Sequence, residues 1–489
     1  MSLPRISIAL WAVSLLSFSW TASTRAEAQG RGWSEPYRLS SEAGRASEGH
    51  CTADLYGYVH CFWTETLFED QRSVIQYARF DGAAWSTPNA IYVTDHGAAS
   101  LSPSVDQNGQ LFLAWVEGFL GPAYYTYAPA HNALSAQNWA PPTQVDIPAR
   151  NLLMRVDAGG VLHILYSQIE DPGVFYTRSA DQGQTWSEPA WLDPDISPGH
   201  VPDSLNFELD QTDGLHAVWF YGAIDQDARP DLVRYAHSLD GGRTWSAPIA
   251  MDESVPESGH LLTNASPVMA VEGQTVHVVW AAGDLPYRYH RMSTDAGQTW
   301  SAPRQVFGEL HGQAFDGLAF DRAGRLHFLG QIRYPQGIYH ATWDQGRWTS
   351  PTLVYLIAQE GEEIGDRIHA HSTHPAVRAG NQLVLTFTDG PADPNRRLFV
   401  MHRLLDDLEP LEPLPTPAST ASLVPGPSSS PPASTPSPTR TPQAPILDSA
   451  NRPFGHGGAS GLALTVPLVP ALLLLAAVLA IRLVGRPRP

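Results

Sequence analysis

Hydrophobic and polar residues alternate along this chain in short runs, a pattern that predicts β-strands rather than helices. Seven such runs have apolar residues at alternating positions, as expected for strands with one buried face. These runs are Val59–Trp63, Leu111–Trp115, Leu162–Tyr166, Leu215–Trp219, Val276–Trp280, Leu326–Leu329 and Leu383–Phe387. A further strand is predicted to begin at each of six tryptophans, namely Trp85, Trp139, Trp186, Trp245, Trp300 and Trp348. Many short strands at regular spacing indicate an all-β fold.

The segments before three of these tryptophans share the pattern S-x-D-x-G-x-T-W, followed by Ser, one variable residue and Pro. The pattern predicts a tight turn, because Asp accepts hydrogen bonds from backbone N–H groups two residues on and Gly takes the φ > 0 position. The Trp carries a large apolar surface that can pack against a neighbouring unit. The constant positions are Ser179, Asp181, Gly183, Thr185, Trp186, Ser238, Asp240, Gly242, Thr244, Trp245, Ser293, Asp295, Gly297, Thr299 and Trp300. Three copies with a period of about 50 residues indicate a propeller-type array.

This repeat resembles the Asp-box, or BNR repeat, of the sialidase-like β-propellers, and all three copies fit every fixed position. The resemblance implies a β-propeller in which the boxes are structural turns on the face away from the ligand site. Two further boxes, at residues 81–85 and 344–348, are shortened by one residue before the Trp, and the unit that ends at Trp139 has lost its box.

The repeat count predicts how the ring closes. Seven units contain the first three strands, but only six continue into a Trp-led strand. The missing strand stands near the start of the chain, where Trp33 and Pro36 repeat the W-S-x-P pattern ahead of Leu39. We predict that this N-terminal strand completes the last blade and hides edges that would otherwise promote aggregation. The predicted fold class is an all-β, sialidase-like propeller over residues 29–408, with seven blades and with six as the alternative.

Both ends of the chain predict export and membrane anchoring. An apolar run after Arg5 and the small residues Ala26 and Ala28 indicate a signal peptide over residues 1–28. Residues 409–460 are rich in Pro, Ser and Thr and predict an extended stalk. Residues 461–482 have the length and apolar character of a transmembrane helix. The arginines that follow it place residues 483–489 in the cytoplasm.

Charge and cysteine content narrow the possible partners. A net charge of −19 argues against nucleic acid as a partner.

Cys51 and Cys61 are the two cysteines of the chain, and they flank one predicted hairpin turn. We expect them to form a disulfide in an exported protein, and the alternative is two half-buried thiols. No calcium-binding run is present, and we assign no cofactor and no metal. We expect a monomer that recognises a glycan or a surface protein.

The loops opposite the boxes are the candidate ligand face, and the densest of them covers residues 360–374. It contains His369, His371 and His374, which would bind a metal if the loop folded around one. A solvated loop with hydrogen-bonded histidines is the favoured alternative. We expect this loop and Arg396 to belong to the binding face.

Sialidase chemistry, which the resemblance implies, needs an arginine cluster for the sugar carboxylate, a Tyr nucleophile with a Glu partner, and an Asp acid/base. The family's F/Y-R-I-P motif has its nearest match at residues 37–40, which lack the Pro and fall inside a repeat strand. Arg333 and Tyr334 form the one adjacent Arg–Tyr pair in a candidate loop. Arg367 and Asp70 are the other catalytic candidates, and no motif singles out any of the four.

Three functions fit these observations. The first is recognition or processing of glycans at the cell surface by a sialidase-like propeller. The second is hydrolysis by an exo-α-sialidase-like glycosidase, against which stand the missing motif and the additional blade. The third is a non-enzymatic scaffold that binds protein partners. Whether the chain is an enzyme is left open by the sequence.

Overall fold

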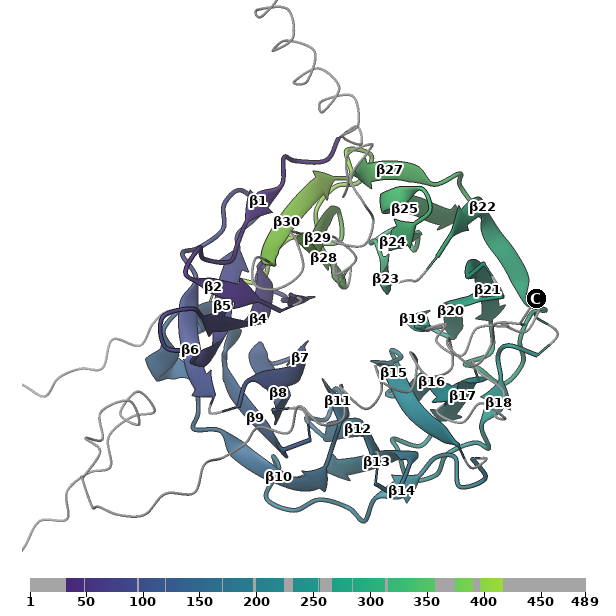
Figure 1. Ribbon diagram of the computed structural model, residues 1–489, viewed down its shortest axis with the longest axis horizontal. Helices are drawn as coiled ribbons and strands as arrows, with labels where there is room; N and C mark the ends of the chain where they lie inside the picture. The colour runs from purple at the N-terminus through teal and green to yellow at the C-terminus, as the bar shows by residue number, and fades with distance from the viewer. Residues whose placement is uncertain are drawn as a thin grey trace, which may run out of the picture. The chain divides into compact units, whose positions relative to one another are not determined.

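The protein forms seven antiparallel sheets placed around a central axis (Figure 1). The structure, a computed structural model, describes residues 32–416 except 48, 95, 119, 169, 197–198, 224–231, 254, 256–265, 284, 313–314, 357–373 and 390–395. The described residues belong to one unit, Met1–Ile446. The prediction of a seven-bladed, all-β propeller is therefore confirmed, and the six-bladed alternative is wrong.

Blades 1 to 3 follow one another along the chain. Blade 1 contains β2 (Gly44–Ala46), β3 (His50–Ala53), β4 (Val59–Leu67), β5 (Ser73–Phe80) and β6 (Asn89–Thr94). Blade 2 contains β7 (Ala98–Val105), β8 (Gln110–Glu117), β9 (Pro122–Pro129) and β10 (Thr143–Pro148), with two 3₁₀ turns, η1 (Ala130–Asn132) and η2 (Ala136–Asn138), before β10. Blade 3 contains β11 (Asn151–Val156), β12 (Leu162–Gln168), β13 (Gly173–Ser179) and β14 (Ala190–Trp191).

Blades 4 to 7 complete the ring. Blade 4 contains β15 (His200–Leu209), β16 (Leu215–Ala223), β17 (Leu232–Ser238) and β18 (Ile249–Ala250). Blade 5 contains β19 (Val268–Glu272), β20 (Thr275–Ala282), β21 (Tyr287–Ser293) and β22 (Arg304–His311). Blade 6 contains β23 (Phe315–Phe320), β24 (Leu326–Arg333), β25 (Gln336–Asp344), β26 (Arg347–Trp348) and β27 (Thr352–Tyr355). Blade 7 contains β28 (His374–Arg378), β29 (Gln382–Asp389), β30 (Arg397–Leu404) and β1 (Tyr37–Arg38).

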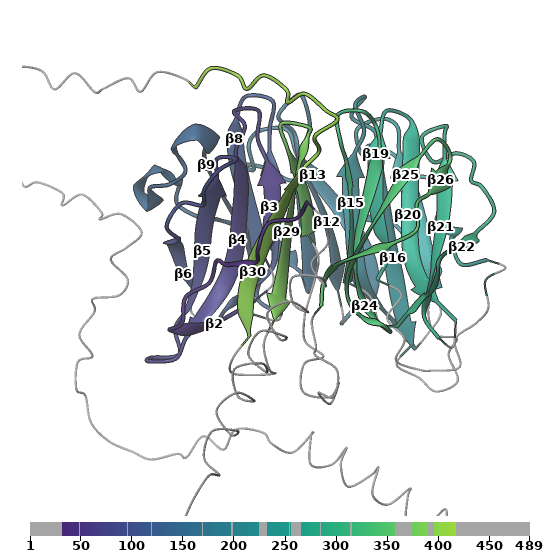
Figure 2. The same cartoon turned by 90° about the horizontal axis from the view of Figure 1, so that it is seen from above.

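The innermost strands of the seven blades contact one another in a closed circle. Each contacts the innermost strand of the next blade, in the order β3, β7, β11, β15, β19, β23, β28 and back to β3. The strands run from one face of the ring to the other (Figure 2). Because each sheet is an antiparallel meander, the turns that join first to second and third to fourth strands lie on one face, which we call the box face. The remaining connections lie on the opposite face, called here the loop face.

The fourth strands begin later than the sequence pattern predicts. Each was expected to start at its Trp, but pairing begins at the residue after the Pro of the W-S-x-P pattern, as at Asn89, Ala190, Ile249 and Tyr37. Proline has no N–H to donate to a ladder, so regular pairing starts after it. The Trp itself lies before this strand, and in blade 6 Trp348 belongs to the separate strand β26, where it pairs with Trp343.

Hydrogen bonds within the box turn explain its sequence. In the first box the Thr185 N–H and hydroxyl both donate to the Asp181 carboxylate, at 2.9 and 2.6 Å. The Ser179 hydroxyl donates to the same carboxylate and accepts from the Gly183 N–H, at 2.7 and 2.8 Å. The other two boxes repeat this set. The Asp therefore caps the N–H four residues on, rather than the one two residues on that the sequence suggested.

Six of the seven tryptophans of the repeat pack on a ring from the preceding blade, whereas Trp85 stacks on Phe80 of its own blade. The ring pairs, with centroids 4.7–6.3 Å apart, are Trp139–Tyr77, Trp186–Tyr125, Trp245–Tyr176, Trp300–Tyr235, Trp348–His290 and Trp33–His340. In the three complete boxes the Gly faces the same tyrosine, and a Cβ on Gly297 would lie 1.8 Å from the Tyr235 hydroxyl oxygen. Glycine is therefore required at this position for two reasons, because the backbone has a positive φ of +82° and because the two blades approach too closely for a Cβ.

Five of the six rings that receive these tryptophans also bind a buried histidine, whereas the Tyr125 hydroxyl donates to the Gln182 carbonyl oxygen. In blade 4, His216 Nδ1 lies 2.6 Å from the Tyr235 hydroxyl and its Nε2 lies 3.4 Å from Asp210 Oδ2. In blade 5 a second histidine replaces the tyrosine, and His277 Nδ1 lies 2.9 Å from His290 Nε2. These networks satisfy polar groups in a region without solvent.

The N-terminal strand closes the ring as predicted. β1 pairs with β30 in the register Tyr37↔Val400, and the Ser34 N–H donates to the His402 carbonyl oxygen at 2.8 Å. Trp33 and Leu39 on either side of β1 are both buried. Blade 7 is thus built from both ends of the propeller sequence.

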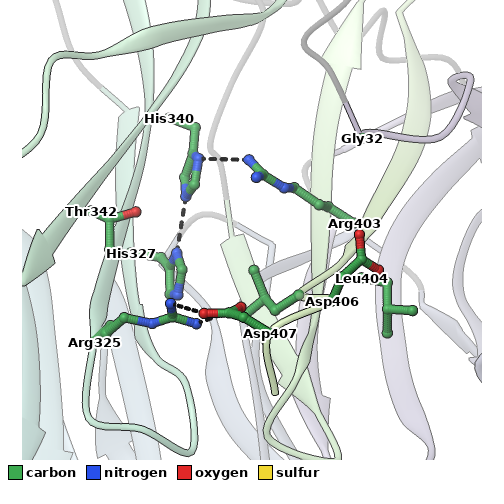
Figure 3. Close-up of a pocket in the computed structure, with 10 residues that line it drawn as sticks. Gly32, Arg325, His327, His340, Thr342, Arg403, Leu404, Asp406 and Asp407 are labelled. Carbon is green, nitrogen blue, oxygen red and sulfur yellow. Dashed lines mark hydrogen bonds and ion pairs between the residues drawn. The ribbon is translucent and has the colours of Figure 1, made fainter. Parts of the chain in front are cut away.

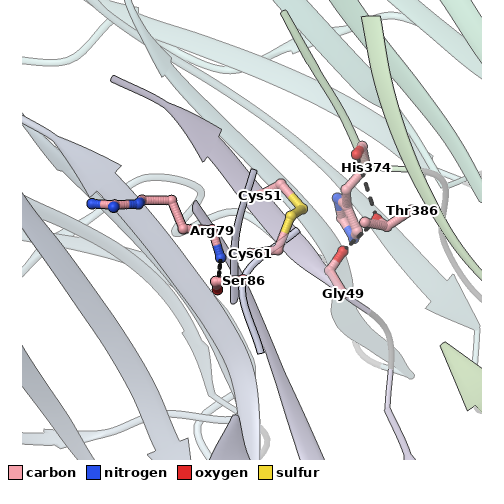
Figure 4. The surroundings of a disulfide bond; sticks show 7 residues. All are labelled: Gly49, Cys51, Cys61, Arg79, Ser86, His374 and Thr386. Carbon is pink, nitrogen blue, oxygen red and sulfur yellow. Dashed lines mark hydrogen bonds between the residues drawn. A yellow bond between two sulfur atoms is a disulfide. The ribbon is translucent and has the colours of Figure 1, made fainter. Parts of the chain in front are cut away.

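A disulfide between Cys51 of β3 and Cys61 of β4 lies close to this closure (Figure 4). The two cysteines face each other across the ladder and belong to an apolar cluster shared by blades 1 and 7. Beside them the Thr386 hydroxyl of blade 7 donates to the Gly49 carbonyl oxygen at 2.8 Å. The covalent link therefore stiffens blade 1 where it meets the blade completed last.

The chain continues along the box face beyond residue 408, where the propeller was expected to end. The Leu411 N–H donates to the Ala379 carbonyl oxygen and the Leu414 N–H to that of Leu55, at 2.8 and 2.9 Å. In the described part of the chain no helix combines the length and apolar character required to cross a membrane. The predicted span, residues 461–482, lies outside that part, as do residues 1–28 and most of the predicted stalk.

Deleting residues 30–40 should lower the melting temperature sharply, because it removes β1 and exposes the surfaces that Trp33 and Leu39 cover. Truncating one such buried side chain typically costs about 3–5 kcal/mol. Thermal unfolding followed by circular dichroism provides the measurement. A deletion variant that melts like the intact chain would refute the closure.

Gly297→Ala should destabilise the protein by about 2–4 kcal/mol, because left-handed strain adds to a clash with Tyr235. Gly346→Ala is the matched control, since Gly346 has φ +79° with nothing within 4 Å of its Cβ position. The control should cost only the strain, about 1 kcal/mol. Equal losses in urea titrations of the two variants would show that the contact between blades contributes nothing.

Stability should fall as the pH is lowered from about 7 to about 5, because buried histidines take up protons only on unfolding. Burial lowers the pKa of His290 and His340 to about 3 and that of His277 to about 4. In the unfolded chain these groups titrate near the ordinary value of 6.5. Each therefore lowers the free energy of unfolding by up to about 1.4 kcal/mol per pH unit below that value. Urea denaturation at several pH values measures the slope, and a flat profile would contradict the assignment.

Candidate functional site

Four side chains meet on the loop face where blades 5 and 6 adjoin. Tyr287 begins β21 and His311 ends β22, both in blade 5, whereas Arg333 ends β24 and Tyr334 follows it in the turn to β25 of blade 6. We call this group the rim cluster. It contains the adjacent Arg–Tyr pair that was a candidate from the sequence, together with two residues that sequence reasoning missed.

The aromatic part of the cluster is a partly exposed stack. The His311 ring lies on the Tyr334 ring with centroids 5.2 Å apart and an interplanar angle of 22°, and Tyr287 lies 5.4 Å from His311 on its own blade. Tyr334 is 40% exposed. His311 and Tyr334 also exchange two backbone hydrogen bonds, at 3.0 and 3.1 Å. The stack is therefore held by the main chain and presents an aromatic face to solvent.

Arg333 supplies a positive charge beside the stack. Its guanidinium carbon lies 5.6 Å from the centroid of the Tyr334 ring, within cation–π range. Its Nε is buried and has no hydrogen-bond partner among the residues that the structure describes. Gly312 lies against it, with a Cβ position only 2.5 Å from the Arg333 Cβ and a φ of +105°. The chain can approach Arg333 this closely only because that position is glycine.

A buried ion pair supports the cluster from below. Arg288 and Asp316 have side chains without solvent exposure, and Nε of the arginine lies 2.9 Å from a carboxylate oxygen. Arg288 also donates to the Gly312 carbonyl oxygen at 2.6 Å and to that of Gln331 at 3.2 Å. Removing one partner of such a pair leaves a buried charge unpaired, which destabilises the fold. The pair therefore fixes the two chain segments that lead to the rim cluster, at Gly312 and at Gln331.

The other sequence candidates are dispersed. Asp70 lies in an exposed turn of blade 1, where hydrogen bonds from the Arg72 backbone and side chain hold the pKa of the Asp70 carboxyl below its ordinary value. The group is therefore ionised near neutrality and unsuited to act as an acid there. Arg367, His369 and His371 lie outside the described residues.

His374 and Arg396 both lie where blade 7 meets blade 1. The His374 ring is 4.2 Å from the His50 ring, and Arg396 Nε donates to the Ala46 carbonyl oxygen at 3.1 Å. Both residues therefore contact the neighbouring blade, and they do not join the rim cluster.

Arginines near the axis are paired within the protein. Arg150 lies 3.3 Å from Asp203, and Arg155 lies 2.8 Å from Glu208, in each case across the boundary between blades 3 and 4. Together with Arg288, these guanidinium groups each hold a carboxylate of the next blade. None of the three is free to grip a sugar carboxylate as the arginines of a sialidase do.

A pocket of about 500 Å³ opens on the box face between blades 6 and 7 (Figure 3). Its lining residues are Gly32, Arg325, His327, His340, Thr342, Arg403, Leu404, Leu405, Asp406 and Asp407. A polar chain runs through it, since Arg403 Nη1 lies 3.4 Å from His340 Nδ1 and His340 Nε2 lies 2.9 Å from His327 Nδ1. This pocket was not predicted from the sequence, because residues from both ends of the propeller meet there.

Comparison with known proteins supports the fold. The search against family models finds no match, and neither does the search of curated proteins. An ulvan lyase of a polysaccharide lyase family, solved bound to -[GlcA(1-4)Rha3S]-, is 11% identical with a TM-score of 0.50, covering 74% of this chain and 95% of that one.

Two further solved structures are similar to this chain. A protein of unknown function from Dyadobacter fermentans DSM 18053 is 15% identical with a TM-score of 0.46, covering 77% of this chain and 100% of that one. A Hadza microbial sialidase is 14% identical with a TM-score of 0.40, covering 75% and 66%. The structural neighbours thus include sialidases and polysaccharide lyases, and the likeness to the ulvan lyase shows a shared propeller fold.

Proposed function

We propose that the protein is a cell-surface propeller that binds acidic glycans through the rim cluster on its loop face. The observation that carries the proposal is the exposed Tyr334–His311 stack with the Arg333 guanidinium beside it. An aromatic face offers apolar contact to the C–H face of a sugar ring, and its edge remains polar. A guanidinium matches the geometry of a carboxylate and binds it through two parallel hydrogen bonds.

Two further considerations support an acidic ligand. The ulvan lyase that shares the fold was solved with a ligand containing GlcA and a sulfated Rha. With a net charge of −19, most of the protein surface disfavours anions. A local cation on the loop face would therefore select ligands whose acidic group lies at the right place. Binding would then depend on a correctly placed carboxylate or sulfate rather than on general charge attraction.

The proposed location of the protein at the cell surface rests on the predicted signal peptide, stalk and membrane span. On this interpretation the propeller is an Asp-box protein displayed outside the cell as a monomer. Catalysis is not part of the proposal, because Asp70 is ionised in an exposed turn and Arg333 and Tyr334 have no carboxylate beside them among their described contacts.

A glycan array that includes uronate-containing, sulfated, sialylated and neutral oligosaccharides tests the proposal. We expect binding to acidic members, with neutral analogues silent. Tyr334→Ala and Arg333→Gln should each weaken binding by about tenfold or more, as expected for a lost aromatic contact and a lost charged hydrogen bond.

Trp191→Ala is the matched control, since Trp191 is an exposed aromatic residue of blade 3 outside the rim cluster. Its binding should equal that of the unaltered protein. Silence on every acidic glycan, or equal losses in the Trp191 and Tyr334 variants, would reject the proposal and favour recognition of a protein partner. Release of sugar from a sialoside panel would instead establish the glycosidase alternative.

A further inference from the structure

The pocket between blades 6 and 7 lies where a box turn stands elsewhere in the ring. In blades 3 to 5 the box Gly and Trp cover the tyrosine of the preceding blade. The corresponding ring of blade 6 is His340, which still receives a Trp, namely Trp33. No turn joins the third and fourth strands of blade 7, because β30 and β1 come from opposite ends of the propeller. The missing turn leaves the open space that the pocket occupies.

The two arginines of the pocket differ in their electrostatic environment. Arg325 is neutralised by Asp321 at 2.7 Å and by Asp407, with which it forms two contacts. Arg403 has no ion-pair partner in the described part of the chain. Its one side-chain hydrogen bond there is to His340 Nδ1, and burial lowers the pKa of His340 to about 3, so that ring is neutral. Arg403 therefore brings an uncompensated positive charge to the pocket.

The remaining lining groups indicate which anion fits. The Thr342 hydroxyl has no hydrogen-bond partner in the described part of the chain and points inward in Figure 3. Asp406 and Asp407 border the pocket on the blade 7 side. Because Asp407 is already paired with Arg325, the one further carboxylate among the described residues beside the Arg403 guanidinium is that of Asp406. This negative charge disfavours a dianion, whereas a planar monoanion can accept two parallel hydrogen bonds from the guanidinium.

We propose that this pocket is a second binding site, specific for a carboxylate monoanion held by the Arg403 guanidinium and the Thr342 hydroxyl. A small carboxylic acid and the uronate of a sugar both present this carboxylate group. The site is on the box face, away from the rim cluster, and it exists independently of glycan binding at the loop face.

Titrations of the purified full-length protein with acetate, glucuronate, glucose and inorganic phosphate, followed by NMR, test this site. Acetate and glucuronate should bind, whereas glucose should not bind and phosphate should bind more weakly than either carboxylate. Tighter binding of glucuronate than of acetate would identify a sugar acid as the source, and equal binding a small carboxylic acid. Failure of both carboxylates to bind, or phosphate binding as tight as theirs, would overturn the proposal.

Arg403→Gln should weaken carboxylate binding by about tenfold or more, since it removes the charge and one of the two parallel donors. Arg347→Gln, at an exposed arginine of β26 in blade 6, is the matched control and should leave binding unchanged. Arg333→Gln separates this site from the rim cluster and should also leave acetate binding unchanged.

Thr342→Val provides a second test should Arg403→Gln fail to fold, because Thr342 forms no side-chain bond that the fold requires. It should weaken binding severalfold while the melting temperature stays close to that of the unaltered protein. Unchanged affinity in both variants, or a loss seen only in Arg333→Gln, would refute the assignment.

Discussion

The contact on which the ring depends is the packing of a tryptophan from one blade against a ring of the blade before it. Trp300 on Tyr235 shows the full arrangement, with Gly297 allowing the two blades to approach. The contact recurs six times in similar form, so each blade covers an apolar face that it cannot bury alone. Hydrogen bonds within the box hold the Trp in place, which explains why a turn motif is coupled to a packing residue.

A ring made of repeated contacts must have one joint that differs, because the chain has two ends. Here the joint is blade 7, where β1 supplies Trp33 in the usual way but no turn connects it to β30. The pocket beside Arg403 fills the space of the absent turn. The disulfide between Cys51 and Cys61 lies in the neighbouring blade, close to this joint.

The two faces of the ring differ in how their polar groups are held. The box face carries turns whose polar groups bond to one another, as Asp181 does with Thr185. On the loop face, the rim cluster is held by main-chain bonds and by the buried pair of Arg288 and Asp316. A binding group on a rigid support loses little freedom when a ligand arrives, which favours recognition.

The sequence by itself determined the repeat and the all-β class and predicted the closing N-terminal strand, because alternation, turn residues and Trp spacing are local properties of the chain. It favoured seven blades over six, and the structure decided between them. It also marked Arg333 and Tyr334, since they are adjacent. Only the tertiary structure brought His311 to Tyr334 and His340 to Arg403, because these residues come from different blades and meet only after the sheets pack. Pairing between blades depends on three-dimensional register, which local patterns do not encode.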